Sequence, residues 1–315
     1  MFVICGEALF DLFGEPSSPE SISFDGRIGG SPLNVAMGLT RLGQEAGFFG
    51  GISRDAFGEM LMQKLHREGI SQDLIVRSDH LTTLSVVQKD DHGHPAYTFY
   101  GANAADRMIM PDDLPEFSEA PTVLHVGSYT ALVEPVAGAL KALIEREQND
   151  TLVSFDPNIR PTVVPDMELW RENTEALMPL TDVIKVSDED LGLILPDKSI
   201  DDIAQGWLGK GPGLIVVTRG ADGANAYCGN RKINCHGVKV KVEDTVGAGD
   251  TFQAALLAGL VKLGVRNRTH LAELDDDRLI RLVEFAIKAA AITCSRRGAD
   301  LPRLPELEKE WKALK

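Results

Sequence analysis

The chain has 315 residues, of which 43% are hydrophobic, so it can bury the core of one large domain or of two ordinary ones. It carries 32 Lys and Arg against 47 Asp and Glu, and this net charge of −15 argues against a nucleic acid or an anionic membrane as partner. The N-terminus resembles no leader sequence, and no apolar run reaches the roughly 18 residues of a membrane span, so we expect a cytoplasmic protein. The four cysteines lack the spacing of a zinc site, which favours reduced thiols.

The first predicted element is a strand from Phe2 to Leu12, interrupted at Gly6-Glu7, with Asp11 at its end. A strand that opens an alternating strand and helix pattern usually lies inside a parallel sheet, and ligands bind beyond the carboxyl ends of such strands. Asp11 is therefore a candidate site residue. A solvated acid at a strand end is the alternative.

A helix is predicted to follow, with Ser31 as its N-cap, Pro32 at the first helical position and Gly43 at its C-terminal end. The glycine before it, Gly30, lets a ligand approach the backbone. Asn34 lies in the first turn, where its side chain can face that ligand. An Asn that satisfies local backbone groups is the alternative.

Two strand-like runs over 82–88 and 97–100 interrupt the strand and helix pattern and predict a hairpin. Together with a strand over 21–28, they predict a small antiparallel sheet outside the main layer. The turn of the hairpin contains His92 and His94, but no acidic or Cys ligand stands at a suitable spacing. We therefore expect solvated histidines there rather than a metal pair.

The rest of the chain alternates strands and helices. Strands are predicted over 45–52, 123–127, 152–155, 181–186 and 214–218, and helices over 55–68, 134–147, 254–263 and 278–295. This pattern predicts one α/β domain over residues 1–315, with a mostly parallel central sheet and helices on both faces. The small sheet would form a β lid from about 14–28 and 80–101.

The predicted lid has an apolar face that a sheet of two or three strands cannot bury alone. A homodimer that clasps lid to lid would cover it. The residues of this face include Leu84, Val86, Tyr97 and Phe99.

Three loops that follow predicted strands carry further candidates. Prolines hold the loop from Asp156 to Pro161 open, and its Arg160 can donate two hydrogen bonds to anionic oxygens, although a surface Arg is the alternative. Ser187 is a good N-cap for the segment after the strand over 181–186. Thr218 opens a Gly-containing turn that can also be a plain hairpin.

The stretch from Asp244 to Asp250, Asp-Thr-Val-Gly-Ala-Gly-Asp, precedes the apolar helix over 254–263. Gly247 and Gly249 remove side chains where a backbone turns tightly with its N–H groups outward, which makes a cradle for an anion. The carboxylate of Asp250 can accept a proton from an attacking hydroxyl, while the neighbouring amides stabilise a transferring phosphoryl group. A Gly-rich turn at an ordinary helix start is the alternative for so short a motif.

This string resembles the C-terminal signature of the ribokinase-like carbohydrate kinases, also called the phosphofructokinase-B family. Residues 29–36, followed by Arg41-Leu42-Gly43, resemble the N-terminal signature of the same family. The resemblance covers essentially the whole chain. It implies a ribokinase-like fold and the ATP-dependent phosphorylation of a sugar hydroxyl, with Mg²⁺ bridging the phosphates. Because residues 296–299 resemble a segment that closes a monovalent-cation loop in relatives, K⁺ is a further candidate cofactor.

The resemblance also assigns roles, residue by residue. It makes Asp250 the catalytic base and the amides of Gly247, Ala248 and Gly249 the anion hole. The sugar would contact Asp11, Gly30, Asn34 and Arg160, and ATP would contact Ser187, Thr218, Gly220, Gly247 and Gly249. The family's Asn-x-x-Glu motif, which organises magnesium through water, reads Ser187-Asp188-Glu189-Asp190 here, so Asp190 offers a shorter carboxylate and Glu189 is a possible stand-in.

Three segments, 6–11, 156–160 and 104–107, look most like those of bacterial fructokinases, so D-fructose is the expected substrate. Kinases of 2-keto-3-deoxygluconate share much of the pattern, and the carboxylate of that sugar would pair with Arg160 or Arg107. A sugar- or nucleotide-binding sensor that lost catalysis is the alternative outside the enzymes. The intact Asp250 and Gly-Ala-Gly argue against it.

Overall fold

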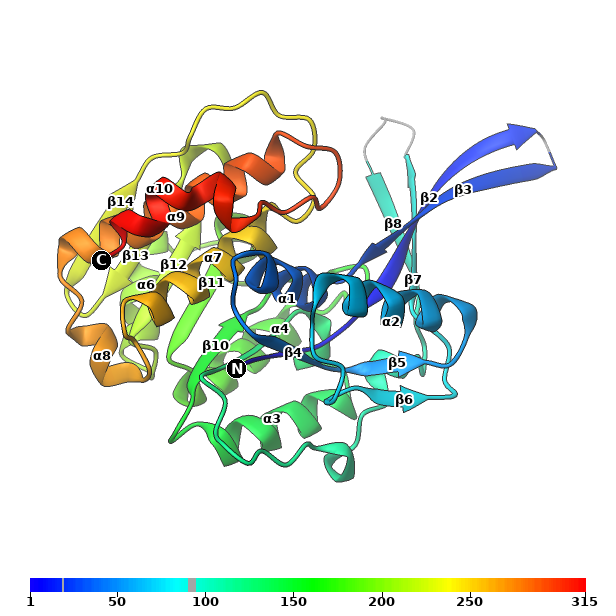
Figure 1. Ribbon diagram of the computed structural model, residues 1–315, viewed down its shortest axis with the longest axis horizontal. Coiled ribbons are helices and arrows are strands. Elements are labelled where there is room, and N and C mark those ends of the chain that lie inside the picture. The colour runs from blue at the N-terminus through cyan, green and yellow to red at the C-terminus, as the bar shows by residue number, and fades with distance from the viewer. Residues whose placement is uncertain (19, 90–94) are drawn as a thin grey trace.

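An eight-stranded sheet forms the centre of the molecule in the computed structural model, which describes residues 1–18, 20–89 and 95–315 (Figure 1). Its strand order is β14-β13-β12-β11-β10-β9-β1-β4. The strands are β1 (Phe2–Cys5), β4 (Ala46–Phe49), β9 (Val123–Gly127), β10 (Leu152–Asp156), β11 (Val183–Ser187), β12 (Leu214–Thr218), β13 (Ala224–Cys228) and β14 (Arg231–Cys235). Pairing is parallel from β4 to β12 and antiparallel from β12 to β14, which confirms the predicted mostly parallel sheet.

Helices cover both faces of this sheet, as the sequence pattern predicts. They are α1 (Ser31–Arg41), α2 (Ala56–Glu68), α3 (Val136–Glu147), α4 (Met167–Leu177), α5 (Asp188–Ile194), α6 (Ile200–Leu208), α7 (Ala248–Lys262), α8 (Arg268–Ala272), α9 (Asp276–Cys294) and α10 (Glu308–Ala313). Short 3₁₀ turns lie at 105–107, 111–113, 129–131, 178–180, 220–222 and 304–307. Helices α1, α7 and α9 share one hydrophobic cluster, whereas α3, α4 and α6 share the other. Within the described residues, no helix combines the length and hydrophobicity needed to cross a membrane.

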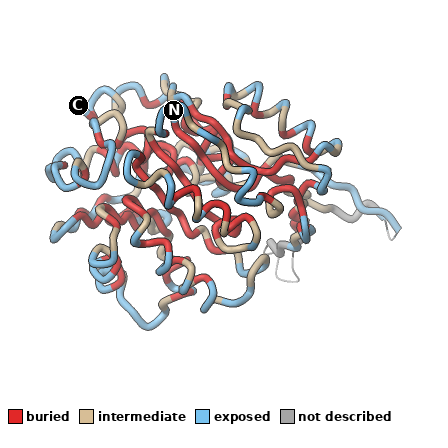
Figure 2. Tube along the Cα trace, turned by 90° about the horizontal axis from the view of Figure 1, so that it is seen from below, coloured by how far each residue is buried: buried red, intermediate tan, exposed pale blue. Residues whose placement is uncertain are grey.

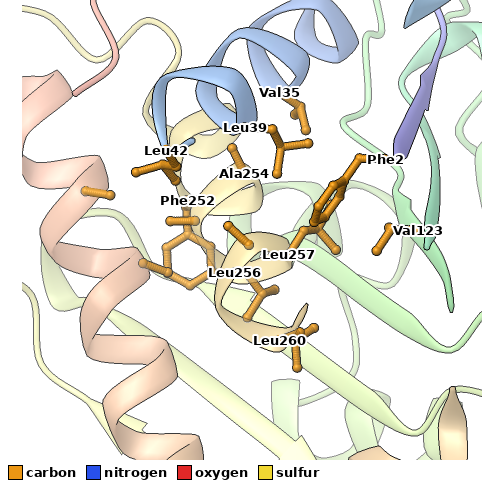
Figure 3. Close-up of a cluster of buried hydrophobic side chains, with 14 of the residues drawn as sticks. Phe2, Val35, Leu39, Leu42, Val123, Phe252, Ala254, Leu256, Leu257 and Leu260 are labelled. Carbon is orange, nitrogen blue, oxygen red and sulfur yellow. The ribbon is translucent and has the colours of Figure 1, made fainter. Parts of the chain in front are cut away.

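The two clusters divide the side chains of the parallel strands between them. In β1, Phe2 and Ile4 belong to the cluster with α1 and α7, while Val3 and Cys5 belong to the other. This alternation is the two-residue period of a strand buried on both faces. Figure 3 shows the first cluster, in which side chains of α1 and α7 meet Phe2 and Val123 from the sheet.

Helix α7 is buried along most of its length, and its close contact with α1 depends on a glycine. A Cβ built on Gly38 of α1 would lie 2.6 Å from the Cβ of Ala254. Real Cβ atoms do not approach so closely, so the absence of a side chain at Gly38 sets the distance between the two helices. This packing fixes the N-terminal turns of α1 and α7 relative to each other.

A second sheet projects from the body of the molecule (Figure 1). Its strand order is β3-β2-β7-β8, formed by β2 (Leu9–Ser18), β3 (Ser21–Gly29), β7 (Leu84–Lys89) and β8 (Pro95–Tyr100). The predicted small sheet outside the main layer is therefore present, although β2 pairs with β7 in parallel and not antiparallel. Residues of β3 become exposed toward the tip of this sheet (Figure 2). The interpretation of His92 and His94 lies outside the described residues.

Two predicted strands are each divided in the structure. The run over 2–12 forms β1 in the central sheet and β2 in the second sheet, and the run over 45–52 forms β4 and then β5 (Gly51–Ser53), which pairs with β6 (Val76–Ser78). The first break lies at Gly6, which has φ +146° and whose Cβ would lie 2.4 Å from Pro32 Cγ. Asp11 therefore lies within β2, and its predicted position at the end of a central strand is wrong.

Candidate active site

The Gly-Ala-Gly segment forms the first turn of α7, which is the helix start that its residues predict. Gly247 is the N-cap, with a left-handed φ of +77°, and a Cβ there would lie 2.7 Å from the Cβ of Ala299. The Ala248 N–H donates to the carbonyl of Thr245 at 3.2 Å, whereas the Gly249 N–H has no acceptor within the described part of the chain. A helix N-terminus with a free N–H group favours an anion.

Asp250 lies in this first turn of α7 and contacts the first turn of α1. The Ser31 hydroxyl donates to Oδ1 of Asp250 at 2.6 Å, and the Asn34 amide donates to Oδ2 at 2.8 Å. Hydrogen bonds to a carboxylate are among the stronger ones in proteins. The structure thus brings together Asp250 and Asn34, which are 216 residues apart.

Ser31 is a site residue that the sequence assigns to another task. The N-cap of α1 is Gly30, with φ +108° and no side-chain cap hydrogen bond, so the prediction of Ser31 as N-cap is wrong. A Cβ on Gly30 would lie 2.5 Å from the carbonyl oxygen of Glu7, which leaves no room for another residue. Because Ser31 is one position further into the helix, its hydroxyl is free to bind Asp250.

A cavity of about 350 Å³ lies between the second sheet, helices α1 and α2, and the loops before α7 and after α9. This volume is within the range of small-molecule sites. Its lining includes Asp11 from β2, Asn34 from α1 and the loop residues Asp244, Val246, Gly298 and Ala299. Two basic side chains of the lining are already paired, Arg27 with Asp25 at 2.7 Å and Lys64 with Glu68 at 2.7 Å.

Asp11 and Arg160 lie close enough for their charges to interact. Burial raises the pKa of Asp11, and the nearby guanidinium of Arg160 lowers it in part. Arg160 also donates to the backbone carbonyls of Asn158 and Ile159, which fixes its position in the loop after β10. The structure thus brings Asp11 and Arg160 near each other, and Asp11 reaches the cavity from the second sheet.

A buried carboxyl group next to this pair is absent from the sequence-based list. Burial raises the pKa of Glu7 to about 7, and the charge of Arg160 lowers it in part. The Thr130 hydroxyl donates to its Oε2 at 3.2 Å. In the sequence, Glu7 appears only as an interruption of a strand, and no local pattern distinguishes a buried carboxyl group from a solvated one.

Ser187 and Thr218 stand opposite each other at the carboxyl edge of the central sheet, where β11 and β12 pair in parallel. Ser187 is the N-cap of α5, as predicted, and accepts the N–H of Asp190 at 2.9 Å. Gly220 follows in an open turn with φ +50°.

Asp190 is buried, and its Oδ1 accepts the N–H of Ile159 at 3.1 Å, so one of its oxygens anchors the loop that carries Arg160. Its predicted stand-in, Glu189, is exposed. Across residues 1–18, 20–89 and 95–315, no group of three or more His, Cys, Asp or Glu side chains is arranged to hold a metal ion.

The model of the pfkB family of carbohydrate kinases matches residues 1–307 of the chain. The chain belongs to this family. It is 34% identical to a fructokinase of Rhizobium leguminosarum bv. trifolii over 89% of this chain and 85% of that protein. The predicted family and fold are therefore confirmed, and as a pfkB carbohydrate kinase the protein transfers a phosphoryl group to a sugar.

Solved structures of two pfkB fructokinases match almost the whole chain. A fructokinase of Xylella fastidiosa with bound ATP has a TM-score of 0.90 and 26% identity, with 99% of this chain and 98% of that one covered. A fructokinase of Vibrio cholerae O395 in a form with fructose, ADP and calcium ion has a TM-score of 0.81 and 30% identity, with 98% of each chain covered.

Proposed function

We propose that this carbohydrate kinase transfers the γ-phosphoryl group of ATP to a terminal hydroxyl of D-fructose. The observation that carries the proposal is the position of Asp250, which Ser31 and Asn34 hold at the free N-terminal turn of α7, beside a cavity of sugar size. The fructokinase relatives and the neighbours solved with ATP and with fructose and ADP support the choice of donor and acceptor. Because ATP is the donor, we place the activity in the cytoplasm.

In this proposal, Asp250 takes the proton of the attacking hydroxyl, and the two hydrogen bonds to its carboxylate keep it oriented. The backbone N–H groups of Gly247, Ala248 and Gly249 stabilise the negative charge of the transferring phosphoryl group. The N–H groups of Gly247 and Gly249 have no acceptor among the described residues, whereas that of Ala248 already donates to Thr245.

The sugar would bind in the cavity beside the second sheet. Asp11 and Asn34 line it and offer partners to hydroxyl groups, while Gly30 lets the sugar approach the backbone. Arg160, close to Asp11, would approach the sugar and the transferring phosphate from the loop after β10.

ATP would lie along the carboxyl edge of the central sheet. Ser187, Thr218 and Gly220 stand there and would contact the nucleotide, together with Gly247 and Gly249. Mg²⁺ would be bound chiefly by the phosphates, with Asp190 reached through water. K⁺ would occupy the loop formed by residues 296–299, where Asp244 already accepts the N–H of Gly298 at 2.8 Å.

The second sheet would act as the lid, with parts from about 14–28 and 80–101, and as the surface of a homodimer. Leu84, Val86 and Phe99 are half-buried within one protomer. Larger exposed apolar side chains lie elsewhere on the sheet, with exposed fractions of 43% for Ile22, 46% for Phe24 and 63% for Tyr100. A second copy would remove these side chains from water. A monomeric mass by light scattering at micromolar concentration would contradict this assembly.

An acid sugar is the alternative substrate, and its carboxylate would need a basic partner in the site. Of the two arginines that would pair with its carboxylate, Arg107 packs over the ring of Tyr129 at 4.9 Å, and neither Arg107 nor Arg160 is in the cavity lining. Of the basic residues that do line the cavity, Arg27 and Lys64 already pair with acidic partners, whereas Arg67 forms no ion pair within the described residues.

The test is to measure kcat/KM for fructose, ribose, 2-keto-3-deoxygluconate and adenosine with ATP as donor. We expect the highest kcat/KM for fructose. A higher value for the acid sugar would contradict fructose as the substrate but would leave the assignment as a sugar kinase unchanged. If no sugar is phosphorylated, the result would favour a sugar- or nucleotide-binding sensor without catalytic activity. Replacing Asp250→Asn should lower kcat by about 10² to 10⁴ while ATP binding and folding stay near normal, and retention of more than about a tenth of kcat would refute the role of Asp250.

A further inference from the structure

Lys185 and Asp156 form a buried ion pair at the carboxyl edge of the central sheet. Lys185 is in β11 and Asp156 ends β10, and the Nζ to Oδ2 distance is 2.7 Å. The exposed fractions are 4% for Lys185 and 2% for Asp156. Lys and Asp are almost never buried so completely unless they are paired.

Stability alone does not account for this pair. Transfer of two charges out of water costs free energy that their attraction rarely exceeds, and apolar residues of similar size often stabilise a core equally well. The pair is also incompletely satisfied, because Oδ1 of Asp156 is buried and accepts no hydrogen bond from the described residues. Perturbed ionisable groups of this kind concentrate at functional sites.

The ammonium of Lys185 lies next to Gly249 in the first turn of α7. A Cβ built on Gly249 would be 3.1 Å from Lys185 Nζ, so the lack of a side chain at Gly249 makes room for the ammonium. The N–H of Gly249, like that of Gly247, has no acceptor among the described residues.

Lys185 also remains a cation in these surroundings. Burial by itself lowers the pKa of its ammonium, but the charges of Asp156, Asp190 and Asp250 outweigh burial and raise the pKa above its ordinary value. The same residues leave a surplus of negative charge close to the place where the phosphates of a nucleotide would bind. Lys185 is the fixed positive charge on the protein side of that place.

We propose that Lys185 is a positioning residue for phosphoryl transfer: Asp156 holds its ammonium next to Gly249, where it supports the Gly-Ala-Gly turn and offsets the negative charge of the transferring group. This proposal rests on the proposed anion-binding role of that turn. It assigns to Asp156 the task of holding the ammonium in place. The step itself is electrostatic, so no bond to Lys185 forms or breaks.

The test compares Lys185→Met with Arg268→Met, a control that removes a cation from another acidic partner, Asp182, away from the α7 turn. In Lys185→Met we expect kcat to fall about tenfold or more, while the KM for sugar changes less than about twofold. The reason is that a charge next to an anion hole acts mainly on the transition state. The control should keep both constants. The double variant Lys185→Met, Asp156→Asn removes the carboxylate left without its partner and should show the same loss of kcat while folding normally.

A second measurement separates the charge from the shape of the side chain. In Lys185→Ala, added methylammonium should restore part of the lost kcat, and it should leave the kcat of the wild-type protein and of Arg268→Met unchanged. A kcat within about twofold of wild type in the folded Lys185→Met or double variant would overturn the proposal, as would a loss that methylammonium does not reverse. Turnover by the wild-type protein tests the proposed function separately, since the role of Lys185 is measured by the ratio of variant to wild type.

Discussion

Glu7 lies in the turn between β1 and β2, and burial raises the pKa of its carboxyl group from 4.5 to about 7. The charge of Asp106 acts in the same direction, whereas that of Arg160 opposes it. A raised pKa means that the folded protein holds the proton more tightly than the unfolded chain does. The stabilisation from Glu7 is therefore complete below about pH 4.5 and is lost as the pH rises through about 7.

The two pKa values set the size of this effect. Their difference of about 2.5 corresponds to about 3 kcal/mol in the free energy of unfolding, since one pKa unit is worth about 1.4 kcal/mol. About 2 kcal/mol of this stabilisation is lost between about pH 5.5 and about pH 8.5. Both pH values lie above the isoelectric point, where the protein could precipitate. Replacing Glu7→Gln keeps the shape of the side chain and removes its titration.

The assay is urea unfolding of the wild-type protein and of Glu7→Gln at both pH values. We expect the wild-type protein to lose about 2 kcal/mol more than the variant on going to the higher pH. Glu145→Gln, an exposed change on α3, serves as the control and should follow the wild type. Equal pH dependence in the wild type and Glu7→Gln would show that the buried carboxyl group does not titrate in this range, and the reasoning from burial would be wrong.

Three further substitutions test the packing and the site. Asp11→Ala should raise the KM for sugar strongly and leave the KM for ATP unchanged; a rise in both would make Asp11 structural. Ser31→Ala removes the 2.6 Å hydrogen bond to Asp250 and should lower kcat, measured with saturating substrates, by about tenfold. An unchanged kcat would show that this hydrogen bond does not contribute to catalysis. Gly38→Ala should cost about 1–3 kcal/mol in urea unfolding, because its Cβ meets α7, whereas Gly206→Ala in α6 has open space and should cost nothing.

The sequence predicted a structural feature correctly where the residues that cause it are close together in the chain. The helix predicted over 55–68 is α2, in which Asp55 is the N-cap and accepts the N–H of Gly58 at 2.7 Å, and which ends at Gly69 with φ +72°. The predicted caps and breaks depend on neighbouring residues alone, so the sequence contains them. The alternation of strands and helices likewise predicted the class of the fold.

The division of the strand over 2–12 has its cause in distant parts of the chain. Residues before Gly6 pair with β9 and β4, and those after Ala8 pair with β7 and β3, which no pattern within eleven residues reveals. The site shows the same limit. Motifs pointed to Asp250 and Asn34, but Glu7 and Lys185 look like ordinary polar residues until tertiary contacts bury them.

The position of β1 affects how the protein is made. This strand lies between β9 and β4, and its register pairs Phe2 with Val123, so the first residues to be synthesised wait for more than a hundred others before their sheet can close. Contacts of such sequence separation slow folding, and they leave apolar strands open to misassociation in the meantime. The N-terminal strand therefore cannot fold into its sheet early during synthesis, although it leaves the ribosome first. Removing residues 2–5 would also take away an interior strand of the sheet, so trimming this end should be far more harmful than trimming the last helix.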